Sequence, residues 1–190
     1  MVMLVVALAL ASGSLMACAP GQERQEAQEV VAYLDKVSPF VTEYLERVNA
    51  VYEGNAAYVR VLETRDEYRL LEVLAAQSVA VDEALHATDS GISTLANSIP
   101  PSRAQLFHSL TKESMNAARD GLGEWDHAYA ELYDWTYARF HPPMRYGEFP
   151  DVSKEMTQGR RLLRDALDTF KQAQDETDRM LEFVGQQVKT

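Results

Sequence analysis

The sequence contains a single cysteine, seven prolines and nine glycines among its 190 residues. With only Cys18 present, no disulfide can form within the chain, so the hydrophobic core alone must stabilise the fold. The chain also lacks a Cys-x-x-Cys-His haem motif, a Gly-x-Ser-x-Gly elbow and a Gly-rich phosphate loop. These absences disfavour an enzyme or a haem protein, and we predict neither catalytic activity nor a cofactor.

Basic residues are also few. The 18 Lys and Arg residues are outnumbered by 29 Asp and Glu residues, which gives a formal net charge of -11. No charged residue precedes Glu23, so the whole of this charge belongs to the chain after the N-terminal segment. An acidic surface of this kind repels nucleic acids and anionic lipid headgroups, and no nucleic-acid partner is predicted.

The N-terminal segment joins an apolar run, residues 1–11, to the tetrapeptide Leu15-Met16-Ala17-Cys18. The run is shorter than the roughly 20 residues that span a bilayer. Run and tetrapeptide together resemble the signal peptide and lipobox of bacterial lipoproteins. The segment departs from that family in having no basic residue before the apolar run, which a start codon placed too late would explain. A plain secretory signal and a buried N-terminal helix are the alternatives.

The lipoprotein resemblance implies that residues 1–17 are removed and that Cys18 then carries diacylglycerol on its thiol and an acyl chain such as palmitate on its amino group. Two or three acyl chains would hold the protein stably on the extracytoplasmic side of a membrane, whereas a single chain binds only marginally. Ala19 differs from the Asp that marks inner-membrane retention in this family. The resemblance therefore points to the outer membrane where the organism has one.

The remainder of the chain carries four long amphipathic patterns. Apolar residues recur at alternating steps of three and four, the spacing of one face of an α-helix, and no segment alternates with the period of a strand. After a short linker over residues 18–24, we predict one domain over residues 25–190. The predicted inward stripes are Val30, Leu34, Val37, Val41, Tyr44, Val48, Val51, Asn55, Tyr58 and Leu62 in the first helix; Leu71, Leu74, Ser78, Val81, Leu85, Thr88, Ile92, Leu95 and Ile99 in the second; Phe107, Leu110, Ser114, Ala118, Leu122, Trp125, Tyr129, Leu132, Thr136 and Phe140 in the third; and Val152, Met156, Gly159, Leu163, Ala166, Phe170, Ala173, Thr177, Met180 and Val184 in the fourth.

Prolines and capping residues set the predicted boundaries. Pro39 is expected to kink the first helix without ending it, because the stripe keeps its phase there. Thr64-Arg65-Asp66-Glu67 fits a capping box that opens the second helix. Pro100-Pro101 separates the second helix from the third, and a loop over residues 141–150 leads to Asp151, which caps the fourth.

Four long helices with short connections predict an all-α fold, an up-down-up-down four-helix bundle. In that topology the turn near Thr64 and the loop over residues 141–150 lie at one end. The proline corner at Pro100 and the C-terminus lie at the other, beside the start of the first helix.

Two Glu-x-x-His motifs, at residues 83–86 and 124–127, raise the alternative of a ferritin-like metal protein, because di-iron bundles use this spacing. The stripes place Leu85 and Trp125 inward and so turn the motif residues outward. In antiparallel helices the two motifs would also be offset by roughly 15 Å along the bundle. A metal site is therefore not predicted.

Aromatic residues crowd the last turns of the third predicted helix and the loop after it. One interpretation is that they fill a wide end of the bundle, since aromatic residues at helical spacing usually belong to a core. The other is a docking surface, because Trp, Tyr and Arg are enriched at interface hot spots and residues 133, 135 and 137 point in different directions around a helix. The candidate binding residues are Trp125, Tyr129, Tyr133, Trp135, Tyr137, Arg145, Tyr146 and Phe149.

The sequence thus predicts a lipid-anchored, extracytoplasmic helical bundle that binds a cell-envelope protein, or acts as a scaffold, through this aromatic end. A small-ligand-binding or sensor bundle is the alternative. The Pro100-Pro101 corner followed by His108 resembles uncharacterised helical lipoproteins of bacteria, a resemblance that implies no known activity.

Overall fold

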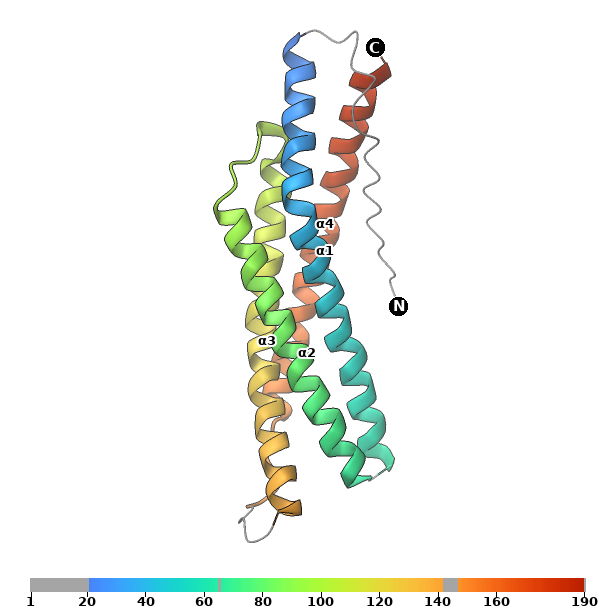
Figure 1. Ribbon diagram of the computed structural model, residues 1–190, viewed down its shortest axis with the longest axis vertical. Helices are drawn as coiled ribbons and strands as arrows, with labels where there is room; N and C mark the ends of the chain where they lie inside the picture. Colours follow the sequence, from blue (N-terminus) through green and yellow to red (C-terminus); the bar gives the residue numbers. More distant parts are fainter. Residues whose placement is uncertain (1–20, 65, 142–146, 190) are drawn as a thin grey trace.

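The computed structural model describes residues 21–64, 66–141 and 147–189. The described residues form four long α-helices and one short 3-10 turn, with no strand among them: α1 (Gly21–Thr64), α2 (Glu67–Ala96), η1 (Ser102–Ala104), α3 (Gln105–Phe140) and α4 (Ser153–Lys189). The predicted all-α four-helix bundle is confirmed (Figure 1). The predicted lipobox lies outside the described residues, while residues 21–24 of the predicted linker already belong to α1.

Successive helices run in opposite directions, as Figure 1 shows. The start of α1, the proline corner between α2 and α3, and the end of α4 lie toward one end, which we call the proximal end. The turn between α1 and α2 and the chain between α3 and α4 lie at the opposite, distal end, as predicted. The closest neighbours are α3 with α4 and α1 with α2, whereas α1 and α4 touch over a shorter stretch.

The core follows the predicted stripes closely in α1, α3 and α4. In α1 every predicted inward residue is buried except Leu62, which is 40% exposed because Val61 takes the inward place at the end of the helix. None of the described helices is long and apolar enough to cross a membrane.

The predicted stripe of α2 is wrong along one edge. Leu74, Val81, Thr88 and Leu95 are buried as predicted, but the second row of inward residues is Gln77, Ala84 and Gly91. The predicted row of Ser78, Leu85 and Ile92 is only partly buried. Ala84 and Gly91 on this row are small and let α2 approach its neighbours closely, so the larger Leu85 and Ile92 pack at the flank.

The ends of α2 also differ from prediction. Thr64 is the last residue of α1, with its hydroxyl donating to the Val61 carbonyl at 2.9 Å, and it does not cap α2. The N-cap is Asp66, whose Oδ1 accepts from the Arg69 N–H at 3.1 Å. At the other end α2 stops at Ala96, and Ile99 is 95% exposed instead of buried, because a residue before proline disfavours the helical conformation.

Other predicted boundaries hold. α1 continues as one helix through Pro39. α3 ends at Phe140 as predicted. Asp151 precedes α4, and its Oδ1 accepts from the Ser153 N–H at 3.1 Å, which satisfies one of the unpaired donors at the helix start.

The proline corner is fastened to α1 and α4 by charged side chains. The Glu26 carboxylate accepts from the Ser102 hydroxyl at 2.9 Å and pairs with Arg103 at 3.2 Å. The Ser102 hydrogen bond and the Arg103 charge hold the pKa of Glu26 below its usual value. The Arg103 guanidinium lies 3.8 Å from the centre of the Phe183 ring of α4. These contacts hold three helices together at the proximal end.

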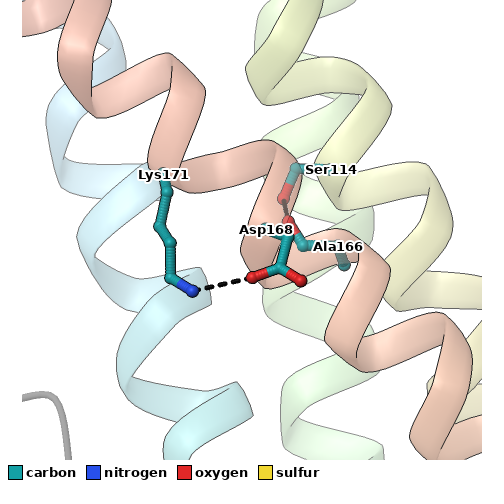
Figure 2. A network of polar contacts seen from close by, with 4 residues as sticks. All are labelled: Ser114, Ala166, Asp168 and Lys171. Atoms are coloured by element: carbon teal, nitrogen blue, oxygen red, sulfur yellow. Dashed lines mark hydrogen bonds and ion pairs between the residues drawn. The ribbon is translucent and has the colours of Figure 1, made fainter.

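α3 and α4 approach closely at two buried glycines. A Cβ atom added to Gly159 would lie 2.8 Å from the Gly121 carbonyl oxygen and 2.3 Å from Cδ1 of Trp125. About two turns away along both helices, the Ser114 hydroxyl donates to the Ala166 carbonyl at 2.8 Å, inside the bundle (Figure 2). The backbones of α3 and α4 can pack this tightly only because small residues face each other.

On its exposed side, α4 carries ion pairs between residues of the same helix. Figure 2 shows Lys171 paired with Asp168, at 2.7 Å, on the exposed side of the helix. An exposed pair three residues apart contributes only about 0.3–0.5 kcal/mol. The fold therefore depends on the small-residue seam between α3 and α4 and not on such surface pairs.

Candidate functional site at the distal end

Large apolar side chains reach solvent at the distal end. We call the group contributed by α1, α2, α3 and the chain before α4 the distal aromatic surface; it consists of Leu62, Tyr68, Trp135, Phe140 and Phe149. Tyr68 is 74% exposed and Phe149 is 53% exposed. The Tyr68 ring stacks on Phe140 with centroids 4.7 Å apart, and Phe149 meets Trp135 edge-on at 5.1 Å. Contiguous exposed apolar groups mark interaction sites, whereas scattered ones need no explanation.

A hollow of about 230 Å³ opens within this surface. We call it the distal hollow; its lining is Val61, Leu62, Asp66, Glu67, Leu70, Trp135, Thr136, Arg139, Phe140 and Phe149. Sites for small molecules usually occupy roughly 300–1,000 Å³. The distal hollow is smaller than that range and suits one side chain of a binding partner better than a whole ligand.

Polar contacts hold the rim of the distal hollow in place. Arg139 of α3 pairs with Glu67 of α2 at 2.7 Å, and its guanidinium lies 5.4 Å from the centre of the Trp135 ring. The Trp135 Nε1–H donates to the Gly147 carbonyl at 3.0 Å. This bond ties the chain before α4 to α3 and so positions Phe149 beside the hollow.

A second, larger opening lies between α1 and the start of α4. This α1–α4 groove has a volume of about 500 Å³ and is lined by Asn55, Tyr58, Val59, Phe149, Pro150, Asp151, Val152, Ser153, Met156 and Arg160. It exists because α1 and α4 cross and their distal parts stand apart (Figure 1). Phe149 lines both the groove and the distal hollow, so the two openings meet at this ring.

The eight predicted binding residues do not lie together in the structure. Trp135 and Phe149 belong to the distal aromatic surface. Arg145 and Tyr146 lie outside the described residues. Trp125 and Tyr129 are fully buried, so for this pair the core interpretation of the aromatic cluster applies.

Trp125 is enclosed by neighbours on three helices. Its Nε1–H donates to the Met156 carbonyl of α4 at 3.1 Å, and its ring meets Tyr52 of α1 and Tyr129 of α3 edge-on at 5.7 and 6.2 Å. With its only polar atom satisfied inside the bundle, Trp125 has no group left to present to a partner.

Tyr133 and Tyr137 form a separate stack along α3. Their rings are 5.9 Å apart, and the Tyr137 ring stacks on His141 with centroids 3.9 Å apart. The His141 Nδ1 lies 2.9 Å from the Tyr137 carbonyl oxygen, which fixes the imidazole at the helix end. These residues line neither the distal hollow nor the α1–α4 groove.

A buried polar network adjoins the groove at Asn55. The Tyr129 hydroxyl donates to Oδ1 of Asn55 at 2.8 Å, and burial raises the pKa of Tyr129 well above its usual value, so the hydroxyl keeps its proton. Gln77 of α2 donates from Nε2 to the Val51 carbonyl at 2.8 Å. Asn55 was predicted to be buried; Gln77 was not. The structure makes room for it at Gly54, where an added Cβ would lie 1.7 Å from the Gln77 Oε1.

A second polar pair lies near the proximal end. The Tyr33 hydroxyl of α1 and Nδ1 of His108 of α3 are 2.8 Å apart. Burial raises the pKa of Tyr33, and burial together with the charge of Lys112 lowers the pKa of His108. Both groups are therefore neutral near pH 7 and link two helices, which is a structural role.

The Glu-x-x-His motifs make ordinary surface contacts. Glu83 pairs with Arg47 of α1 at 2.6 Å, and Glu124 accepts from Gln158 of α4 at 2.7 Å. His86 is exposed. Within residues 21–64, 66–141 and 147–189, no group of three or more His, Cys, Asp or Glu side chains is arranged to hold a metal ion.

Comparison with protein families, with curated proteins and with solved structures finds no match to this chain. The chemistry of the distal end and the N-terminal sequence are therefore the basis for assigning a function.

Proposed function

We propose that this protein is a lipid-anchored protein-binding module of the bacterial cell envelope, which docks a partner protein on its distal aromatic surface. The observation that carries the proposal is the position of the exposed apolar side chains. Among the described residues, seven large hydrophobic side chains are exposed, and four of them lie at the distal end: Val59, Leu62, Tyr68 and Phe149. Random exposure would scatter them along the bundle.

The shape of the surface supports a protein partner. An interface needs a few buried anchors surrounded by contacts that exclude water. The distal hollow is of a size to accept one apolar side chain of the partner. Phe140 and Phe149 line it, and Tyr68 stacks on Phe140 beside it. The Arg139–Glu67 pair at the rim adds polar groups that can fix the register of the partner.

Alanine at Tyr68 and Phe149 together tests the docking surface. Both side chains are largely exposed, so we expect the variant to fold with nearly unchanged stability and to lose at least roughly ten-fold in partner affinity, as hot-spot residues do. The measurement is quantitative capture of envelope proteins by the purified variant.

Val79→Ala is the matched control. Val79 is an exposed residue of α2, 59% accessible, and it lines neither opening. Its variant should capture the same partner at the unmodified level. Equal capture by all three proteins would exclude docking on the distal aromatic surface.

The lipid anchor is tested separately at Cys18, which lies outside the described residues. Cells that express the natural chain should incorporate labelled palmitate into this protein, and Cys18→Ala should abolish the label because no other cysteine exists. The readout is labelled protein per total protein after electrophoresis. Equal labelling of both chains would remove the anchor from the proposal and leave the distal surface unaffected.

A further inference from the structure

The α1–α4 groove has apolar walls at its distal part. They are formed by Tyr58, Val59, Phe149, Pro150, Val152 and Met156. Its volume of about 500 Å³ falls within the roughly 300–1,000 Å³ that small-molecule sites occupy. Walls of this composition bind the apolar body of a ligand through burial of its surface.

The polar groups of the groove lie at its opposite, inner part. α1 and α4 run in opposite directions, so Asn55 on α1 and Arg160 on α4 both lie farther from the distal end than Val59 and Val152 do. From Val152 to Arg160 the groove extends about 12 Å along α4 at 1.5 Å per residue. The inner part of the groove is therefore polar, and its distal part is mainly apolar, with Asp151 and Ser153 beside Val152.

Asn55 supplies a neutral donor at the inner half. The residue is only 8% exposed, and its Oδ1 is occupied by the Tyr129 hydroxyl. Its amide nitrogen has no hydrogen-bond partner among the residues that the structure describes. This nitrogen is not one of the buried side-chain atoms that lack a partner, and Asn55 lines the groove, so the N–H groups are open to an acceptor atom of a ligand there.

Arg160 supplies a positive charge beside this donor. It makes no ion pair with any described residue, although the protein carries a net charge of -11. Arg160 is the one basic residue among those that line the groove. A guanidinium group without an ion-pair partner favours an anion.

One carboxylate also lines the groove, at its far distal end. The Ser153 side chain and the Ser153 N–H both interact with Asp151 there, which lowers the pKa of Asp151 and keeps it ionised. It lies beside Val152, while Arg160 lies at the other end of the groove. The charge pattern therefore orients an anionic ligand with its charged group toward Arg160 and its apolar body toward Phe149.

We propose that the α1–α4 groove binds a small apolar molecule that carries one carboxylate, with Arg160 and the Asn55 amide holding the carboxylate and Tyr58, Phe149 and Met156 enclosing the body. This proposal does not rest on the docking function, and the groove and the distal aromatic surface have only Phe149 in common.

Decanoate and decan-1-ol, which share an apolar chain and differ in the charged group, are the probes. They are titrated calorimetrically into the full chain carrying Cys18→Ser, so that no covalent acyl chain competes for the groove. We expect saturable binding of one decanoate per chain and at least ten-fold weaker binding of decan-1-ol. Arg160→Gln should weaken decanoate binding about ten-fold and leave decan-1-ol unchanged.

Arg161→Gln is the control with the same net charge, because Arg161 is exposed on α4 and does not line the groove. It should bind decanoate as the unsubstituted chain does, and so should Tyr68→Ala, which alters only the docking surface. The proposal is overturned if decanoate does not bind saturably, if decan-1-ol binds equally well, or if Arg160→Gln and Arg161→Gln weaken decanoate binding to the same extent.

Discussion

Gly159→Ala is expected to lower the free energy of unfolding by about 3 kcal/mol, the upper part of the usual range for overpacking a core. The new methyl group would lie 2.8 Å from the Gly121 carbonyl oxygen and 2.3 Å from Trp125 Cδ1. The first of these is a backbone atom, so the strain cannot be relieved by turning one side chain. α3 and α4 would have to separate along the seam where Ser114 reaches Ala166. Urea unfolding followed by circular dichroism measures the loss.

Gly123→Ala is the matched control for this prediction. Gly123 lies one residue past Leu122 on α3, and no heavy atom lies within 4 Å of an added Cβ. Alanine favours a helix over glycine by about 1 kcal/mol, so this variant should be more stable than the natural chain. If both alanine variants shift the urea midpoint in the same direction, the close approach of α3 and α4 at Gly159 is wrong.

Trp125→Ala is expected to have the largest effect on stability, a loss of about 4 kcal/mol. The side chain is fully buried and contacts α1 and α4 as well as α3. Its removal leaves a large cavity and the Met156 carbonyl without its donor, and both effects destabilise the folded state. Thermal and urea unfolding of the purified variant provide the measurement.

Trp125→Phe separates the two causes, because it keeps most of the ring volume and removes only the indole N–H. We expect it to cost about 1–2 kcal/mol. A folded Trp125→Ala protein as stable as the natural chain but unable to capture its partner would instead identify Trp125 as a binding residue, contrary to its position in the core.

The sequence predicted the helices well because each apolar stripe extends over many turns, so one polar or small residue does not hide the pattern. In α1 the inward residues from Val30 to Tyr58 are buried as predicted. In α2 the stripe was ambiguous. Leu85 and Ile92 are larger and more hydrophobic than Ala84 and Gly91, so a prediction based on hydrophobicity alone places them in the core. Which row faces inward depends on how closely the neighbouring helices approach, and one helix viewed alone does not contain that information.

Turn chemistry was ambiguous for a similar reason. Thr64 and Asp66 are both good N-cap residues. Glu67 lies three positions after Thr64, so the sequence matches the capping-box motif. The tight turn between α1 and α2 leaves α1 helical through Thr64, so only Asp66 is free to cap α2. Where α1 ends thus determines which residue caps α2, and the local sequence alone does not fix that end.

The candidate site could be located by sequence but not resolved into its parts. The surplus of aromatic residues near the end of α3 predicted that some would reach solvent, and Trp135 and Phe149 do so beside Tyr68. Whether each of the remaining aromatic residues of α3 is buried depends on which other helix packs against that side of α3. The α1–α4 groove was not predicted, because it arises from the crossing of two helices that are far apart in sequence.

Site-specific photo-crosslinking in intact cells tests most directly whether the distal end is the working surface. A benzophenone amino acid replaces Tyr68 in one strain and Val79 in another, and both strains are irradiated under the same conditions. We predict one discrete adduct from position 68, absent when Phe149→Ala is introduced in the same chain, and none from position 79. Equal adducts from both positions, or adducts from position 79 alone, would contradict the account.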